Sequence, residues 1–312
     1  MYKEKIFLVA GKRTAIGKFG GTLLDISPAE LGKITARATI ASSGDEVLIG
    51  ARVNEVIIGN VLGAGHGMNI ARQICLGAGL PITTPAYLLN KVCGSGLKAV
   101  VLACQGILCG DSELVLAGGV ESMSQTVFVS KTARWGAKLG NVEMQDLILQ
   151  DGLTDVFNSC HMGITAENLA TKYNISRKDQ DAFALESQKR ALLAISSGFF
   201  KEEICPVPLM KRGKQVGEFL TDEHPRADTT IETLSSLKPA FKPDGSVTAG
   251  NASGINDGAA TVLLASEGCV KNLGLKPMAE IIGWASSGVE PEIMGIGPVS
   301  ACLLYTSPSP RD

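Results

Sequence analysis

A cysteine lies where an apolar strand gives way to an apolar helix, and this junction constrains the fold more than any other stretch of the chain. Residues 86–89 read Ala-Tyr-Leu-Leu, which predicts a short buried strand. Apolar residues then recur at helical spacing from Leu97 to Leu108, and Gly110 ends the pattern. Cys93 falls between the two elements. The sequence therefore predicts a strand, a turn and a helix of a layered α/β protein, with a thiol at the start of the helix.

A thiol in this position is a candidate nucleophile. Free amide hydrogens and the positive end of the helix dipole stabilise a thiolate at a helix N-terminus. Gly94 and Gly96 leave the backbone bare, so that an acyl group can approach and an amide hydrogen can meet a developing oxyanion. A buried structural cysteine in a glycine-rich turn is the alternative for Cys93.

The composition favours a soluble enzyme. A length of 312 residues predicts about two domains. Hydrophobic residues make up 45% of the chain and 36 residues are glycine, which excludes a disordered protein and favours a tightly turned α/β fold. A net charge of -2 provides no basic surface for nucleic acid. The N-terminal apolar run is too short for a signal peptide, and no run approaches the ~20 apolar residues that span a bilayer, so we expect no membrane partner.

The eight cysteines are scattered without a Cys-x-x-Cys pair. That pattern indicates neither a zinc site nor a disulfide framework, and we expect no bound metal. Reduced thiols in a cytoplasmic protein are the simplest interpretation.

An alternation of strands and helices in the first part of the chain predicts a largely parallel sheet. Residues 27–30 read Ser-Pro-Ala-Glu, a capping box that opens a helix. Between residues 125 and 248 the sequence becomes charged and irregular, with one clear helix that opens at Ser176 and stops at Gly198. The strand pattern resumes at residues 260–265.

Four motifs resemble those of the thiolase family and follow in the family's order. The residues at 90–97, Asn-Lys-Val-Cys-Gly-Ser-Gly-Leu, resemble its active-site motif. The other three stretches are 117–124, then 151–155 with 161–168, and finally 247–258. The likeness runs from about Lys5 to Ala301. It implies the α/β thiolase-like layered αβαβα fold, with the first half and its loop domain complete and the second half mostly missing.

The resemblance also implies a division of the chain. We expect residues 1–124 and 249–275 to form the N-terminal half with the nucleophile, residues 125–248 the coenzyme A binding loop domain, and residues 276–301 the start of a truncated C-terminal half. Residues 302–312 resemble a translated sequencing adaptor and are expected to be a non-native tail. Their Ser-Pro-Ser-Pro stretch cannot form the interior of a helix. A natural disordered tail is the alternative.

The implied activity is acyl transfer by covalent catalysis. The thiolate of Cys93 would attack acetyl-CoA, and a second acetyl-CoA would then be condensed to acetoacetyl-CoA with release of coenzyme A. In this interpretation acetyl-CoA, acetoacetyl-CoA and CoA are substrates and products, and the chain needs no further cofactor. The resemblance to thiolases also implies that the intact protein is a homo-oligomer.

Nine further residues match family positions along coenzyme A or its acyl group. They are Leu153, His161, Met162, Arg226, Thr233, Phe241, Ala249, Ser253 and Met294. An arginine near adenine fits physically, because its guanidinium can stack on a base and also face a phosphate. A solvated charge is the alternative for Arg226.

The family's proton-transfer groups do not appear in these 312 residues. In thiolases a Gly-His-Pro histidine takes the thiol proton, beside an Asn-Glu-Ala-Phe asparagine, and a second cysteine in a glycine-rich loop acts as acid and base. The only histidines here are His66, His161 and His224, and none lies in a Gly-His-Pro motif. His161 holds a substrate-loop position and is not expected to be the base, so we expect the chain as written to be inactive.

Other functions compete with this one. A degradative 3-ketoacyl-CoA thiolase is the nearest alternative. A β-ketoacyl synthase also places a cysteine at a helix start on this fold, but the long charged insert and the Asn-Ala-Ser-Gly stretch favour coenzyme A over a carrier protein. From another class, a thiolase-like protein could bind acyl-CoA or lipid without turnover, and the chain could also be no functional product at all.

Overall fold

The computed structural model describes residues 4–306, which divide into two compact units. Unit 1 comprises the chain up to Ile148, together with Phe200–His224 and Ile255–Ile282. Unit 2 comprises Leu149–Phe199, Pro225–Gly254 and the described residues from Gly283 onward.

Unit 1 is built on a seven-stranded sheet. Six strands lie in the order β13-β1-β12-β5-β3-β4, and β2 pairs with β12 beside them. Their bounds are β1 Ile6–Arg13, β2 Gly17–Lys18, β3 Glu55–Gly59, β4 Ala86–Leu89, β5 Leu114–Ser122, β12 Asn256–Ser266 and β13 Ala279–Glu280. Its helices are α1 Pro28–Ser43, α2 Glu46–Arg52, α3 Ile70–Gly77, α4 Ser95–Cys109 and α8 Glu267–Leu273.

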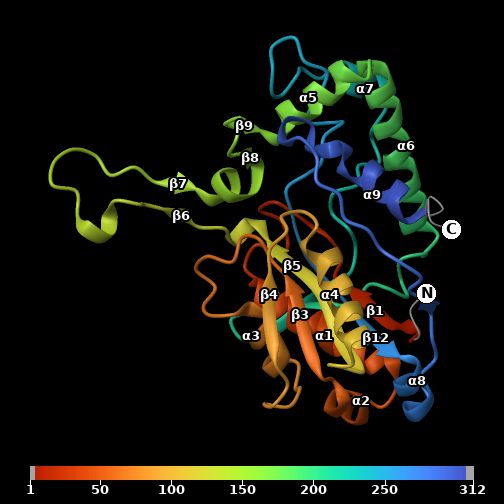
Figure 1. The fold of residues 1–312 in the computed structure, drawn as a ribbon. Helices are drawn as coiled ribbons and strands as arrows, with labels where there is room; N and C mark the ends of the chain where they lie inside the picture. Colours follow the sequence, from red (N-terminus) through yellow and green to blue (C-terminus); the bar gives the residue numbers. More distant parts are fainter. Residues whose placement is uncertain (1–3, 307–312) are drawn as a thin grey trace. The chain divides into compact units, whose positions relative to one another are not determined.

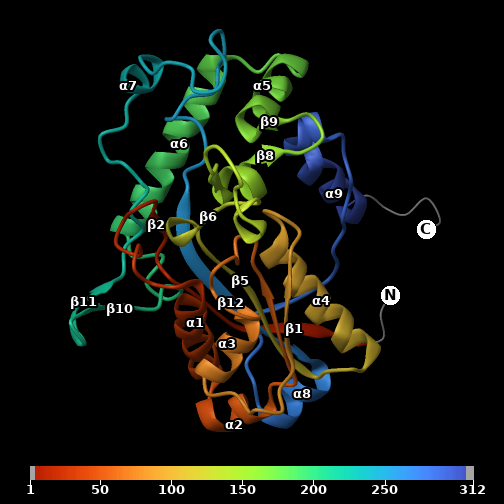
Figure 2. The ribbon, with the colours of Figure 1, turned by 90° about the vertical axis from the view of Figure 1, so that its left-hand side faces the viewer.

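Helices cover both faces of this sheet. In Figure 2, α1 and α3 lie on one side of the strands and α4 lies on the other. The central runs of three strands, at residues 56–58, 114–117 and 262–265, are apolar at every position, as expected when both faces are buried. Along β5, Leu114 and Leu116 join the core cluster that α1 and α3 share, and Val115 and Ala117 between them are buried as well. Unit 1 is thus a three-layered α/β body, which confirms the expected fold class.

The prediction of a largely parallel sheet was wrong for the pairing of the central strands. Only β5, β3 and β4 pair in parallel, whereas β12 pairs antiparallel with both β1 and β5. The reason lies in the connections. The chain leaves the sheet after Ser122 and returns at Asn256, next to the point where it left, because Asp257 pairs with Ser122. A strand that begins beside the end of its neighbour must run in the opposite direction.

The elements predicted around the cysteine and in the insert are confirmed. β4 ends at Leu89, and α4 ends before Gly110, whose φ of 81° is left-handed. The helix predicted from Ser176 is α6, and its Ser176 makes a capping box with Asp179. At α1 only half of the predicted box forms. Ser27 Oγ accepts from the Glu30 amide, but the Glu30 carboxylate accepts from Lys33 at 2.9 Å, because that cation lies within reach on the same helix.

Two hairpins extend from the sheet of unit 1. The first carries β6 Phe128–Val129 and β7 Gln145–Asp146, joined by a long excursion that projects from the sheet (Figure 1) and holds the short helix η2 Ala133–Trp135. The short helix η1 Met123–Gln125 precedes it. The second consists of β10 Val207–Lys211 and β11 Lys214–Phe219.

Both hairpins belong to unit 1, whereas all of residues 125–248 were expected to form the loop domain. For the second hairpin, Arg13 explains the difference. Its carbonyl oxygen accepts from the Cys205 amide at 2.8 Å, and its guanidinium donates to Asp222 at 2.8 and 3.1 Å and to Glu203 at 2.7 Å. These contacts fix both ends of Phe200–His224 to the first strand.

Unit 2 consists of helices and short strands. The π-helix η3 Ile148–Leu153 leads into it, and the hairpin β8 Thr154–Asp155 with β9 Cys160–His161 follows. Its helices are α5 Met162–Lys172, α6 Arg177–Ser196, α7 Ile231–Ser235, η4 Pro291–Ile296 and α9 Gly297–Thr306. The Asn168 side chain on α5 donates to the Glu292 carbonyl of η4 at 2.9 Å, which fixes η4 against α5.

The last part of the chain differs in one respect from the expectation. β13 pairs with β1 at an edge of the first sheet, whereas residues 276–301 were expected to begin a second half. The proposed tail at 302–312 falls partly in α9, and its residues 307–312 lie outside the described residues.

One segment, Val92–Cys109, is long and apolar enough to cross a membrane by length and composition alone. It contains α4, whose Ala99, Ala103 and Cys104 are buried. α4 packs on β3 and β5, and core helices of soluble proteins pass the same test.

Candidate active site

The turn that carries Cys93 is held by its own side chains. Asn90 Oδ1 accepts from the Val92 amide at 2.8 Å, which tightens the turn after β4. The hydroxyl of Ser95 accepts from the Lys91 amide at 2.8 Å and donates to the Val92 carbonyl at 2.6 Å. Gly94 is the N-cap of α4, so Cys93 lies one residue before the cap and is exposed. The predicted position at the helix start is thus correct to within two residues.

Val92 has a strained backbone. Its φ of 48° lies in the left-handed region, which a side chain branched at Cβ rarely adopts. Such strain persists only where the surroundings impose it, and it concentrates at functional sites. Here the bonds from Asn90 and Ser95 impose it, and they turn the next residue, Cys93, out of the strand direction.

Three glycines let α4 begin directly on the sheet. A Cβ on Gly59, the last residue of β3, would lie 2.4 Å from the Ser95 carbonyl carbon, and a Cβ on Gly119 of β5 would lie 3.1 Å from the Cα of Gly96. Neither space allows an alanine without movement of backbone. From the sequence, Gly96 was expected to let an acyl group approach. The structure gives it a packing role, in which it faces Gly119.

The eight cysteines differ in burial: four are buried, three are exposed, and Cys160 is half-buried. Burial raises the pKa of Cys104 and of Cys269 to about 11, and it also raises the pKa of Cys75 and Cys205. These thiols stay protonated at neutral pH and are poor nucleophiles. The exposed cysteines are Cys93, Cys109 and Cys302. Cys93 alone among them combines exposure with a strained turn before a helix.

A half-buried glutamate near the end of the interior strand β5 was missed by sequence reasoning. Glu121 follows the end of the β3–β5 pairing and accepts from the amides of Val61 and Leu62 at 2.9 and 3.0 Å, and from the Asn60 side chain at 2.9 Å. Burial raises the pKa of Glu121, although these bonds oppose the shift. The carboxylate fixes the chain where it leaves β3. The motif that contains Glu121 was recognised, but its spacing gave no sign of this contact.

His161 and Phe241 lie together in unit 2. His161 is the N-cap of α5, where its Nδ1 accepts from the Gly163 amide at 3.0 Å. Its ring stacks on Phe241, with centroids 4.7 Å apart and planes at 19°. A Cβ on Gly163 would lie 2.2 Å from the Phe241 ring, so glycine is required there. The structure thus brings together two of the residues predicted to bind substrate, and Met162 begins the same helix.

Other predicted binding residues lie on loops and helix starts of unit 2. Ala249 and Ser253 are exposed on the loop after α7, and Met294 is exposed on η4. The Thr233 hydroxyl accepts from the Thr230 amide at 2.9 Å in the capping box of α7. This bond engages the hydroxyl locally, which the sequence analysis did not anticipate.

Arg226 and Leu153 complete the predicted set. Arg226 is exposed, and its amide donates to the Gln188 side chain at 2.9 Å. Leu153 is half-buried at the end of η3. All nine predicted binding residues belong to unit 2, whereas Cys93 belongs to unit 1.

The histidines differ in their surroundings. His66 lies in unit 1, and burial lowers its pKa. In the part of the chain that the structure describes, its Nε2 is buried without a hydrogen-bond partner. It is therefore held neutral near physiological pH. In the described residues, no three His, Cys, Asp or Glu side chains form a group that could hold a metal ion.

The fold and the cysteine turn define a protein of the thiolase class, and comparison with known proteins agrees. The family model described as "Thiolase, N-terminal domain" matches residues 6–268. The chain belongs to the thiolase family.

The similar proteins carry acetyltransferase names. The chain is 52% identical over 298 residues to an acetyl-CoA acetyltransferase of Pseudomonas aeruginosa, covering 96% of this chain and 75% of that one. It is 51% identical over 312 residues to an acetyl-CoA acetyltransferase of Thiocystis violacea, covering 99% and 78%. The crystal structure of the Bacillus anthracis acetyl-CoA acetyltransferase superposes with a TM-score of 0.93 at 43% identity, over 99% of this chain and 78% of that one.

Proposed function

We propose that this chain carries the nucleophile and the coenzyme A binding part of an acetyl-CoA C-acetyltransferase. The observation that carries the proposal is the exposed thiol of Cys93, which follows a strained residue and precedes a helix. The names of the similar proteins from Pseudomonas aeruginosa and Thiocystis violacea support it. The free cysteines fit a cytoplasmic protein. Membership of the thiolase family supports a homo-oligomer for the intact protein.

In the first half-reaction Cys93 becomes acylated. Its thiolate attacks the thioester carbonyl of acetyl-CoA, a new carbon–sulfur bond forms, and the bond to the coenzyme A sulfur breaks. Coenzyme A leaves as a thiolate that takes up a proton. The oxyanion formed during attack needs amide donors, and amides at the start of α4 are suited to supply one.

In the second half-reaction a carbanion displaces Cys93. A second acetyl-CoA loses a proton from its methyl carbon, and the resulting enolate attacks the acetyl group on sulfur. The product is acetoacetyl-CoA, and the sulfur of Cys93 leaves as a thiolate. The reverse sequence is thiolysis. The groups that move these protons in thiolases match no motif among these 312 residues.

Unit 2 would hold the coenzyme A part of the substrate. Ala249 and Ser253 are exposed on a loop of small residues, which lets a flat pantetheine amide pass close to the backbone. Arg226 is exposed and free to stack on adenine or to face phosphate. The imidazole of His161 would shape the acyl pocket, and its Nδ1 lone pair is already engaged by the Gly163 amide.

The proposed substrate preference is for short acyl chains. His161, Met162 and Met294 are bulky where a long acyl tail would need room. A single methylene changes binding by about 1–3 kcal/mol, so the preference should be graded. One of the similar proteins, from Staphylococcus epidermidis, is named a probable acetyl-CoA acyltransferase, which leaves a wider chain range as the second candidate.

The test joins residues 1–301 to the C-terminal quarter of a close thiolase and compares thiolysis of acetoacetyl-CoA with that of a ten-carbon 3-ketoacyl-CoA. A higher kcat/KM for acetoacetyl-CoA is expected. Equal or higher kcat/KM for the ten-carbon substrate would favour the degradative alternative.

A further inference from the structure

Two carboxylates of unit 2 are almost completely buried, and the proposed reaction uses neither. Glu167 on α5 is 4% exposed and Asp181 on α6 is 1% exposed. Burying a carboxylate is costly unless its oxygens accept enough hydrogen bonds. What these oxygens bind therefore indicates what the two residues do.

Glu167 binds the backbone at the start of one loop. It accepts from the Ser246 amide at 2.8 and 3.0 Å, from the Ser246 hydroxyl at 3.0 Å and from the Val247 amide at 2.8 Å. A Cβ on Gly245 would lie 2.2 Å from Glu167 Oε1, so the loop closes on the carboxylate only with glycine there. Burial tends to raise the pKa of Glu167, but the bonds from the Ser246 and Val247 amides outweigh it and lower the pKa.

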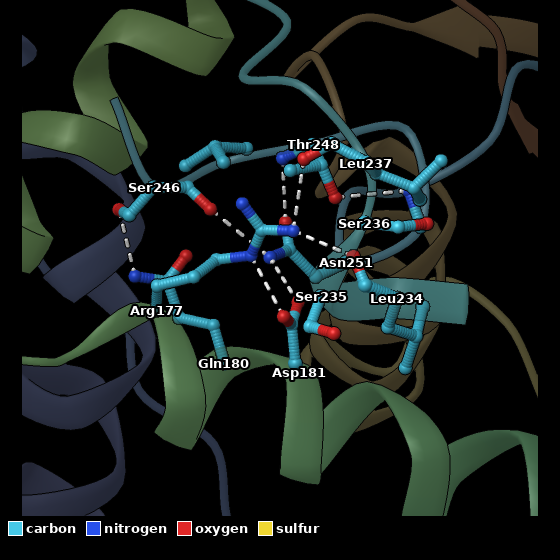
Figure 3. A network of polar contacts seen from close by, with 12 residues as sticks. Arg177, Gln180, Asp181, Leu234, Ser235, Ser236, Leu237, Ser246, Thr248 and Asn251 are labelled. Carbon is cyan, nitrogen blue, oxygen red and sulfur yellow. Dashed lines mark hydrogen bonds and ion pairs between the residues drawn. The ribbon is translucent and has the colours of Figure 1, made fainter. Parts of the chain in front are cut away.

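Asp181 binds the other end of the same loop (Figure 3). It accepts from Arg177 Nε at 2.7 Å and from Asn251 Nδ2 at 2.9 Å. Asn251 in turn donates to the Ser246 carbonyl at 3.1 Å and accepts from the Thr248 amide at 2.7 Å. Both ends of the loop at residues 246–251 are thus fixed to helices by buried anions.

Arg177 extends the network to α7. Its Nη2 donates to the carbonyls of Leu234 and Leu237 at 2.6 and 3.1 Å, at the C-terminal end of that helix. A cation at this end satisfies carbonyls that lack partners within the helix. Two segments that carry predicted coenzyme A contacts, α7 with Thr233 and the loop with Ala249, are therefore tied to α6 through one ion pair.

We propose that Glu167 and Asp181 are positioning residues for acyl-CoA binding, because they fix the loop at residues 246–251, and with it Ala249, against α5 and α6. The inference rests on the proposed function. The two carboxylates would hold this loop in one conformation before substrate arrives. Binding then does not have to order the loop, and no affinity is lost to that entropy cost. Glu167 holds only the loop, whereas Asp181 also acts through Arg177 on α7.

The test measures the dissociation constants of CoA and of adenosine 3′,5′-bisphosphate by calorimetry, using the full 312-residue chain. Glu167→Gln removes acceptors for amides of the loop that would meet pantetheine. CoA should bind about 10- to 100-fold more weakly, the range for a lost hydrogen bond to a charged group. The bisphosphate lacks pantetheine, and its affinity should be unchanged. Asp181→Asn should weaken both ligands.

The matched control is Glu186→Gln. Glu186 is exposed on α6, the helix that carries Asp181, and pairs with Arg190, so this variant makes the same Glu-to-Gln change in unit 2 without touching the loop. Its affinities should equal those of the wild type. Hydrogen exchange adds a local readout, because the Ser246 and Val247 amides should exchange faster in Glu167→Gln than in the control.

Each outcome decides the inference. Unchanged CoA affinity in Glu167→Gln would overturn the positioning role and leave the proposed function intact. If Glu167→Gln weakened the binding of CoA and of the bisphosphate equally, the positioning role would also be overturned, because a general loss of structure would explain that result. If the wild type binds no CoA, both the proposed function and this inference fail. If Glu167→Gln does not fold, Ser246→Ala decides, with about threefold weaker CoA binding expected and unchanged binding contradicting the proposal.

Discussion

Glu167 shows how a single buried side chain can couple the stability of the fold to pH. The bonds from the Ser246 and Val247 amides lower its pKa in the folded chain, against the opposing effect of burial. A carboxylate whose folded pKa lies below its unfolded pKa stabilises the fold above the unfolded value. That stability is lost as the pH falls through the folded value.

The prediction concerns the melting temperatures of the wild type and Glu167→Gln. The wild type should melt at the higher temperature at neutral pH. The difference should shrink as the pH falls below 4.5, the ordinary pKa of glutamate, because protonated Glu167 and glutamine then resemble each other. Circular dichroism over a pH series provides the measurement. A difference that stays constant down to the acid limit would show that the charge of Glu167 contributes nothing.

At the scale of single residues, the sequence predicted some site residues and not others. Cys93 was found because a strand pattern stops and a helix pattern begins on either side of it. Glu121, Glu167 and Asp181 were not found, because their importance lies in contacts with residues about 60 to 80 positions away. Nothing in local periodicity marks an acidic residue as buried, and a charge on a helix is ordinarily solvated.

At the scale of elements, the start of α4 depends on close backbone contact with β3. Gly59 leaves no room for a methyl group, because its Cβ would lie 2.4 Å from the Ser95 carbonyl carbon. Gly106 on α4 is a useful contrast, since a Cβ there meets nothing within 4 Å.

We predict opposite effects for alanine at these two positions. Gly59→Ala should push α4 away from the sheet, lower stability by about 1–3 kcal/mol and slow alkylation of Cys93. Gly106→Ala should raise stability by about 0.5–1 kcal/mol, because alanine loses less conformational freedom than glycine in a helix. Denaturant unfolding and iodoacetamide labelling provide the two measurements. Equal stability for the two variants would contradict the close packing at Gly59.

The elements show where pattern reasoning succeeds. β4, α4 and α6 were predicted because their periodicity and caps are local. The antiparallel direction of β12 was not predicted, because it depends on where the chain returns after an insert of more than a hundred residues. The place of the β10–β11 hairpin in unit 1 depends likewise on Arg13, nearly two hundred residues earlier.

At the scale of the whole molecule, the chain supplies part of the thiolase machinery. The family's proton-transfer motifs are not among its 312 residues, and the polypeptide made as written should give no thiolysis of acetoacetyl-CoA. Loss of one oxyanion donor alone costs about 100- to 1000-fold, and here several groups are lacking together. Residues 1–301 joined to the C-terminal quarter of a close thiolase should be active. The account would be contradicted if the ungrafted chain turned over fully and the His66→Ala or His161→Ala variant lost that activity. The replaced histidine would then be the base.

The most direct test of the central claim asks whether Cys93 carries the acyl group. Residues 1–301 joined to the C-terminal quarter of a close thiolase, and the Cys93→Ser variant of that protein, are exposed briefly to acetyl-CoA, and their peptides are analysed by mass spectrometry. The account predicts an added acetyl group on the wild-type peptide that contains Cys93, and none on the buried Cys104, whose pKa of about 11 keeps it protonated. Acetylation that persists in Cys93→Ser and disappears when another cysteine is replaced would contradict it.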